Sequence, residues 1–179
     1  ADFSASELRV RALIADGDEA SAALWRFVLE HDLVARVRAG LQPVVPPVQW
    51  MVADRRAVTA TIVDHHWLRI LDVPRVLASR TYTAPLATTL RVDDPLGFAD
   101  GAWSLRIDDS GAAEVVPVDA SAGDADVSMS VGALSSLLLG GVRATELAAA
   151  GLVRAPGEIL TAWDAAFAPA AAPLLDIWY

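Results

Sequence analysis

The order of elements in the last two thirds of the chain is the feature that most limits its fold. Four short apolar segments, each a strand candidate, come first, and polar turns rich in Asp, Ser and Gly separate them. Three helical segments follow, each ending at glycine or before proline. This order is typical of an α+β fold, with helices gathered on one side of a mostly antiparallel sheet. The strand candidates are Leu86–Val92, Ala102–Ile107, Ala113–Val118 and Asp126–Val131, and the helices are Gly132–Leu139, Ala144–Ala150 and Glu158–Phe167.

Two further elements are expected directly before these strands. Apolar residues alternate from Thr59 to Asp72 and predict one more strand, which brings the sheet to about five strands. The segment Val73–Arg80 predicts a helix, because Pro74 lies at a first-turn position where its missing N–H costs nothing.

The first third of the chain has a different pattern. Alternation over Leu8–Ala15 predicts a strand, and Asp16 with Glu19 forms a capping-box pattern before a helix. A short strand is expected over Leu33–Arg38, and the prolines of Leu41–Val48 predict an extended connector. Residues spaced by three and four predict the buried stripe of the helix: Ala20, Leu24, Phe27, Val28 and His31.

Composition and charge exclude several classes of function. Hydrophobic residues make up 54 % of the 179, which is enough for a core, but no apolar run is long enough to span a membrane. The net charge of −9 argues against a nucleic-acid partner, whose phosphates attract Lys and Arg. No cysteine is present, which excludes disulfides and thiolate chemistry and agrees with a reducing, cytoplasmic location.

No familiar catalytic motif occurs in the chain. His65 and His66 are neighbours on an expected strand, so they would point to opposite faces, and we predict no metal site there. The acidic pairs Asp93-Asp94 and Asp108-Asp109 stand before Pro or Gly and are interpreted as solvated turns rather than paired catalytic carboxylates. Trp103 shares a strand face with apolar neighbours and is expected in the core.

The chain stops on P-L-L-D-I-W-Y, Pro173–Tyr179, which is unusually apolar for a terminus. Such a segment would be unfavourable in water, and we therefore expect it to dock against protein. Docking would fix the α-carboxylate of Tyr179 in one place.

Several segments together resemble acetyltransferases of the Eis (enhanced intracellular survival) type. Residues 59–179 are similar to the sterol-carrier-protein-like domain that closes these proteins, and residues 1–58 are similar to the end of their second, degenerate GNAT-like domain plus a connector. The likeness rests on W-L-R-I-L-D-V-P-R-V-L-A-S-R-T-Y (Trp67–Tyr82), G-A-W-S-L-R-I (Gly101–Ile107), A-D-V-S-M-S-V (Ala125–Val131), Leu134–Val153, Arg11–Val34 and Gln49–Val58.

The resemblance implies the C-terminal part of an acetyl-CoA-dependent N-acetyltransferase that acts on cationic amines of the aminoglycoside or polyamine type. The Q/R-x-x-G-x-G/A turn that holds acetyl-CoA is absent, so the family pattern assigns it to a domain preceding Ala1 and leaves this chain alone inactive. In the family the terminal carboxylate acts as general base, and only Tyr179 matches that position; Asp176 is a candidate substrate-binding residue.

The resemblance further implies two partners, the rest of the acetyltransferase chain and further copies in a homo-oligomer that is hexameric in the family. Two other functions stay open: a carrier of lipid or another hydrophobic ligand in a tunnel between sheet and helices, and an oligomerisation domain.

Overall fold

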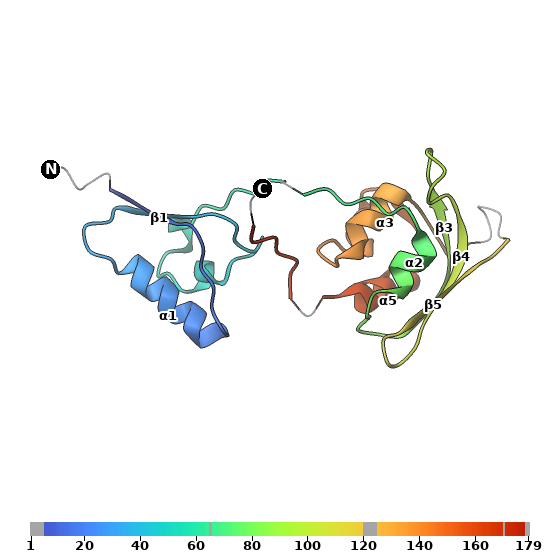
Figure 1. Cartoon of the computed structure of the whole chain (residues 1–179), viewed down its shortest axis with the longest axis horizontal. Coiled ribbons are helices and arrows are strands. Elements are labelled where there is room, and N and C mark those ends of the chain that lie inside the picture. Colours follow the sequence, from blue (N-terminus) through green and yellow to red (C-terminus); the bar gives the residue numbers. More distant parts are fainter. Residues whose placement is uncertain (1–5, 65, 120–124, 170, 178–179) are drawn as a thin grey trace. The chain divides into compact units, whose positions relative to one another are not determined.

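The computed structural model describes residues 6–64, 66–119, 125–169 and 171–177 (Figure 1). The chain forms two compact units: Ala1–His65 with Leu174–Tyr179, and His66–Pro173. The expected domain boundary between residues 58 and 59 stays a prediction.

In the described residues of the first unit, the regular structure is a two-stranded parallel sheet and one α-helix. Strand β1 pairs with β2, and Leu8 lies opposite Val37. Helix α1 connects these strands, and two short 3-10 turns follow β2. The bounds are β1 Glu7–Val10, α1 Asp18–Leu29, β2 Arg36–Ala39, η1 Pro47–Trp50 and η2 Arg55–Ala57.

The predicted start and stripe of α1 are wrong. The N-cap residue is Gly17 rather than Asp16, and no side chain caps the helix. Gly17 has a φ of 95°, which glycine adopts without strain. Trp25 is the residue of α1 that is buried. A helix turns about 100° per residue, so burying Trp25 rotates Phe27 about 200° away, and Phe27 is 68 % exposed. Strand β1 also ends at Val10, well before the predicted Ala15.

The second unit holds a five-stranded sheet in the order β5-β4-β3-β6-β7. All neighbours are antiparallel except β3 and β6, which run parallel. The bounds are β3 Leu86–Asp93, β4 Gly101–Ile107, β5 Ala113–Pro117, β6 Val127–Ser130 and β7 Val153–Arg154. This mixed, mostly antiparallel sheet confirms the α+β class and the four strand predictions.

Four helices accompany the sheet, and Figure 1 shows α2, α3 and α5 on the same face of it. In α2 and α3 the N-cap residue itself caps the helix: the Asp72 carboxylate accepts from the Arg75 N–H at 3.0 Å, and the Ser130 hydroxyl accepts from the Ala133 N–H at 3.2 Å. The bounds are α2 Val73–Ala78, α3 Val131–Leu138, α4 Ala144–Ala149 and α5 Gly157–Phe167. All four helix predictions are confirmed to within two residues.

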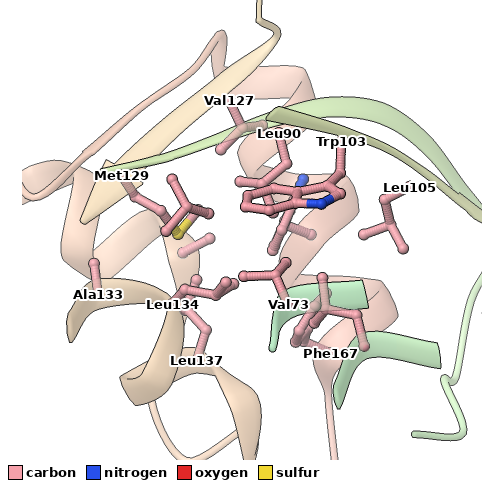
Figure 2. Close-up of a cluster of buried hydrophobic side chains, with 14 of the residues drawn as sticks. Val73, Leu90, Trp103, Leu105, Val127, Met129, Ala133, Leu134, Leu137 and Phe167 are labelled. Carbon is pink, nitrogen blue, oxygen red and sulfur yellow. The ribbon is translucent and has the colours of Figure 1, made fainter. Parts of the chain in front are cut away.

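The core lies between the sheet and these helices. Alternate residues of β3 are buried, and Leu90 of that strand lies opposite Trp103 of β4. Figure 2 shows Leu90, Trp103 and Met129 projecting from the strands toward Leu134 of α3 and Phe167 of α5. The expectation that Trp103 belongs to the core is confirmed, since its exposure is only 7 %.

The strand predicted over residues 59–72 is wrong, because the described residues there form no strand. Their alternation has another cause: Leu68 and Ile70 pack inward, whereas Trp67 is 80 % exposed. The Ile70 N–H donates to the Ser135 hydroxyl at 3.1 Å instead of to a neighbouring strand. The fifth strand is β7, whose two residues are too short to give a sequence signal.

Among the residues that the structure describes, no helix combines the length and the apolar character needed to cross a membrane.

Candidate functional site at the C-terminal end of α5

The last turn of α5 is the point from which the C-terminal segment leaves the second unit. A helix leaves its final carbonyl groups without partners in the helix itself. The guanidinium of Arg80, two residues after α2, supplies partners to two helices at once. One nitrogen, Nη2, donates to the Phe167 carbonyl of α5 at 2.6 Å, and the other, Nη1, donates to the Leu138 carbonyl of α3.

Arg80 is held by aromatic faces as well as by carbonyls. Its guanidinium carbon lies 4.6 Å from the ring centroid of Phe167 and 5.1 Å from that of Tyr82. Burial lowers the pKa of Arg80, and the Tyr82 hydroxyl partly opposes that shift. Since a guanidinium stays charged even so, the cation faces the negative ends of two helix dipoles. Within the described parts of the chain no carboxylate forms an ion pair with it.

One threonine and one tyrosine side chain strengthen the same region. The Thr83 hydroxyl lies 2.6 Å from the Ala165 carbonyl and 3.2 Å from that of Ala168, and the Thr83 N–H donates to the Ala166 carbonyl at 3.1 Å. The Tyr82 hydroxyl donates to the Leu77 carbonyl at 2.8 Å, and burial raises the pKa of Tyr82 to about 12. The end of α5 is therefore fixed by several independent hydrogen bonds.

The segment beyond α5 is only partly buried. Leu174 is 49 % exposed and Ile177 is 57 % exposed, so about half of each side chain is covered. The expectation that this end docks against protein stays a prediction. The described residues of this segment form no helix or strand. Asp176 is exposed, and Tyr179 lies outside the described residues. The role predicted for each of these two residues stays a prediction.

A small cavity of about 120 Å³ lies beside the end of α5. The indole nitrogen of Trp163, one of the lining residues, is buried and has no hydrogen-bond partner in the described structure. Sites for drug-sized ligands usually measure about 300–1,000 Å³. The cavity is therefore too small for a sterol or a long acyl chain. Its lining comprises Leu137, Gly140, Val142, Arg143, Ala144, Trp163, Asp164, Phe167, Ala168 and Pro169.

The two acidic pairs behave differently. Asp108 closes the exposed β4–β5 turn by accepting from the Ser110 and Ala112 N–H groups at 2.8 and 3.0 Å, as a turn residue should. Asp94, in contrast, is buried, and the interpretation of that residue as solvated is wrong. Its carboxylate accepts from the Leu96 and Ala99 N–H groups at 3.0 and 2.9 Å.

An ion pair completes the environment of Asp94. Nη2 of Arg69 lies 2.5 Å from its Oδ1. Burial alone would raise the pKa of Asp94, but the hydrogen bonds from Ala99 and Leu96 and the pairing with Arg69 outweigh it, so the pKa is lowered. These contacts organise the loop between β3 and β4, and the Asp94 side chain is fully buried, so its carboxylate is not presented to solvent.

The histidines form no site among the described residues. His31 is exposed just beyond the end of α1, His66 is exposed, and His65 lies outside the described residues. The described parts of the chain hold no cluster of three or more potential ligands placed to bind a metal ion.

Among the described residues, the start of α1 does not fit the pyrophosphate of acetyl-CoA. After β1 the chain passes through Gly17 into α1, and the backbone N–H groups of the first turn of this helix could in principle bind a phosphate. That turn carries Asp18 and Glu19, whose carboxylates would repel a pyrophosphate. We therefore derive no step of a reaction through acetyl-CoA bound to this chain.

No local pattern in the sequence points to the role of Arg80. The residue stands 58 positions from Leu138 and 87 from Phe167, so the contacts exist only in the folded unit. A basic residue near a helix end is a familiar capping signal, but here the capped ends belong to other helices.

Comparison with known proteins defines the family. Residues 73–176 match sterol carrier protein domains, and residues 2–70 match acetyltransferase (GNAT) domains. The first match alone covers more than half of the chain, which therefore belongs to the sterol carrier protein domain family. The two matches together make it an Eis-like GNAT acetyltransferase region with a sterol-carrier-protein-like domain.

Individual relatives agree with this assignment. The chain is 36 % identical over 164 residues to the N-acetyltransferase Eis of Mycobacterium tuberculosis, which covers 89 % of this chain and 39 % of that protein. It is 37 % identical over 134 residues to an uncharacterized N-acetyltransferase of Streptomyces coelicolor, covering 74 % and 32 %. The crystal structure of Eis1 from Mycobacterium abscessus superposes with a TM-score of 0.80 at 34 % identity, over 97 % of this chain and 43 % of that one. The chain thus spans about a third to two fifths of the curated relatives' length.

Replacing Arg80 tests whether its hydrogen bonds to the ends of α3 and α5 stabilise the second unit. Arg80→Met keeps the length of the side chain but removes both donors, so the free energy of unfolding should fall by about 2 kcal/mol, the usual worth of hydrogen bonds to a charged group. Urea unfolding followed by circular dichroism measures the change. Arg75→Met, at an exposed position of α2, is the matched control and should change stability by less than about 0.5 kcal/mol. Equal effects of the two substitutions would contradict the account of Arg80.

The lowered pKa of Asp94 predicts how its contribution depends on pH. A depressed pKa in the folded state stabilises the protein above the unfolded-state value near 4, and this contribution disappears as the pH falls through the folded-state pKa. The loss of stability caused by Asp94→Asn should therefore be larger at pH 7 than at pH 2.5. Asp93→Asn, the exposed neighbour, serves as the control. A loss for Asp94→Asn that is the same at both pH values would show that the ionised form has no special role.

Proposed function

We propose that this chain is the C-terminal part of an Eis-like acetyl-CoA-dependent N-acetyltransferase that acts on amines of the aminoglycoside or polyamine type. In this proposal the chain supplies its terminal carboxylate as general base and part of the substrate pocket. The observation that carries the proposal is the likeness to Eis1 from Mycobacterium abscessus, which extends over 97 % of the chain and both of its units.

The chemistry of acetyl transfer gives the carboxylate of Tyr179 a defined task. An amine reacts only when its nitrogen lone pair is free, so a proton must leave the cationic substrate. A fixed carboxylate can accept that proton directly or through one water molecule. An ordinary α-carboxyl group titrates at about 3.3–3.7, and burial away from water would raise its pKa toward a useful value.

The exposed C-terminal segment supports this role. Leu174 and Ile177 are about half exposed. Their exposed apolar surface could therefore pack against the rest of the full-length protein. Asp176, three residues before the end, is exposed and carries a negative charge that suits a cationic amine. The net charge of −9 would favour the approach of the same class of substrate.

The rest of the acetyltransferase chain is the partner that we propose for the first unit. That unit has a sheet of two strands, and its large apolar residues include Phe27 and Trp50, which are 68 % and 69 % exposed. A surface of this kind usually lies against other protein. Acetyl-CoA would be bound by that other part, since the helix start at Gly17 does not fit it. We also propose a cytoplasmic homo-oligomer, hexameric as the family resemblance implies.

The alternative of a lipid carrier has less support. The cavity of about 120 Å³ beside α5 is well below the volume of an ordinary ligand site, and side chains such as Trp103 and Leu134 fill the space between sheet and helices.

Removing Tyr179 from the full-length protein tests the proposed base. The deletion shortens the chain by one residue and withdraws the carboxylate by about 3.5 Å, so kcat should fall by about 10²–10⁴-fold, the typical contribution of general base catalysis. The rate is measured as the acetylation of a polyamine such as spermidine, detected by the free thiol of the coenzyme A that is released. The melting temperature of the full-length protein is the control for folding, and we expect it to change little because the deletion removes a single terminal residue.

A matched control separates the carboxylate from the side chain. Tyr179→Phe keeps the carboxylate and removes only the phenol hydroxyl, so its kcat should stay within about threefold of the wild-type value. If the deletion leaves turnover unchanged, or if Tyr179→Phe is as inactive as the deletion, the terminal carboxylate is not the base.

A further inference from the structure

The turn that ends α3 lies directly against the chain that leaves α5. Gly140 has a φ of 75°, and a Cβ atom on it would meet the Phe167 carbonyl oxygen and would lie 2.9 Å from Cδ of Pro169. A Cβ atom on Gly141 would lie 3.3 Å from Cγ of Pro173 and 3.5 Å from its Cδ. The two glycines therefore leave room for the two prolines of the outgoing segment, which pack on the backbone of the turn.

The contact between Gly141 and Pro173 holds the chain at a second point, beyond the end of α5. Arg80 and Thr83 hold the carbonyl groups of residues 165–168, which fixes the end of the helix itself. Gly141 contacts Pro173, which lies five residues further along. The rigid ring of proline restricts the backbone, so holding Pro173 also restricts the direction in which the chain continues.

The position of this anchor determines how far the chain end can reach. Twelve residues follow Phe167, and fully extended they could span about 40 Å, whereas the six residues after Pro173 span about 20 Å. The effective concentration of a tethered group falls roughly as the −3/2 power of the tether length. Halving the free tether therefore raises the effective concentration of the terminal carboxylate about threefold, before any gain in orientation.

We propose that the Gly140–Gly141 turn positions the C-terminal segment for catalysis, by holding Pro173 and thereby limiting the place and direction of the last six residues. Gly141 is a positioning residue in this proposal, because it acts through Pro173 on the terminal carboxylate. The inference rests on the role proposed above for that carboxylate, but the contact itself can be tested without reference to activity.

The substitution Gly141→Val displaces Pro173 with little risk to the fold. Gly141 is exposed, and its φ lies outside the left-handed region, so its backbone accepts a side chain. The added branched side chain would collide with the proline ring. Gly157→Val is the matched control, because Gly157 is also exposed and nothing lies within 4 Å of its Cβ position. Both variants should retain a cooperative thermal transition.

The first readout is the distance between two spin labels in the full-length protein. Ser136→Cys on α3 and Ala172→Cys beside Pro173 are both exposed positions, and this chain has no cysteine of its own. Any cysteine in the rest of the full-length protein is replaced by serine before labelling. Electron–electron double resonance should give a narrow distance distribution for the parent and for Gly157→Val, and a clearly broader one for Gly141→Val. A distribution that Gly141→Val leaves unchanged overturns the positioning role and leaves the proposed base untouched.

The second readout is kinetic. In the full-length protein without labels, Gly141→Val should lower kcat by about threefold from the longer tether alone, and by up to about a hundredfold if the carboxylate moves by about 1 Å. The KM for acetyl-CoA should not change, and Gly141→Ala should have an intermediate kcat. A broadened distance distribution with an unchanged kcat would overturn the catalytic meaning of the contact, even if the deletion of Tyr179 abolishes activity.

Discussion

The guanidinium of Arg80 is the interaction on which the arrangement of the helices depends. It satisfies the terminal carbonyl groups of α3 and α5 together, and it packs against Phe167 and Tyr82. A half-buried cation without a carboxylate partner among the described residues would be unfavourable, but two helix dipoles and two aromatic rings compensate its lost hydration. The ends of α3 and α5 must therefore lie side by side, and the chain must leave the unit at one fixed place.

The packing of the second unit favours a structural role over a carrier role. Helices α2, α3 and α5 cover one face of the sheet, and large side chains fill the space between the layers (Figure 2). The cavity described above lies at the end of α5 rather than along the sheet, and it holds about 120 Å³. A fold shared with sterol carrier proteins thus need not carry a lipid, because function depends on the site and not on the fold. What this unit offers is a rigid support for the C-terminal segment.

Much of the fold could be predicted from sequence, because the signals of the second unit are local. Alternation in β3 and β4, and the glycines that end α3 and α4, give the right elements with small errors. The failures have a physical pattern. Residues 66–71 alternate because Leu68 and Ile70 pack into the core, yet no strand pairs with them. Arg80 and Gly141 hold the end of α5 and the segment after it through contacts with residues that are far away in the sequence. Hydrophobic periodicity does not reveal such contacts. The role of Tyr179 came from family resemblance and stays a prediction.

The central claim is that this chain presents its terminal carboxylate to an amine substrate. A crystal structure of the full-length protein with coenzyme A and a bound polyamine tests it most directly. The account predicts an oxygen of the Tyr179 carboxylate within about 2.6–3.2 Å of the reacting amine nitrogen, or joined to it by one water molecule. A carboxylate that lies further away, with another side chain in contact with that nitrogen, would contradict the account.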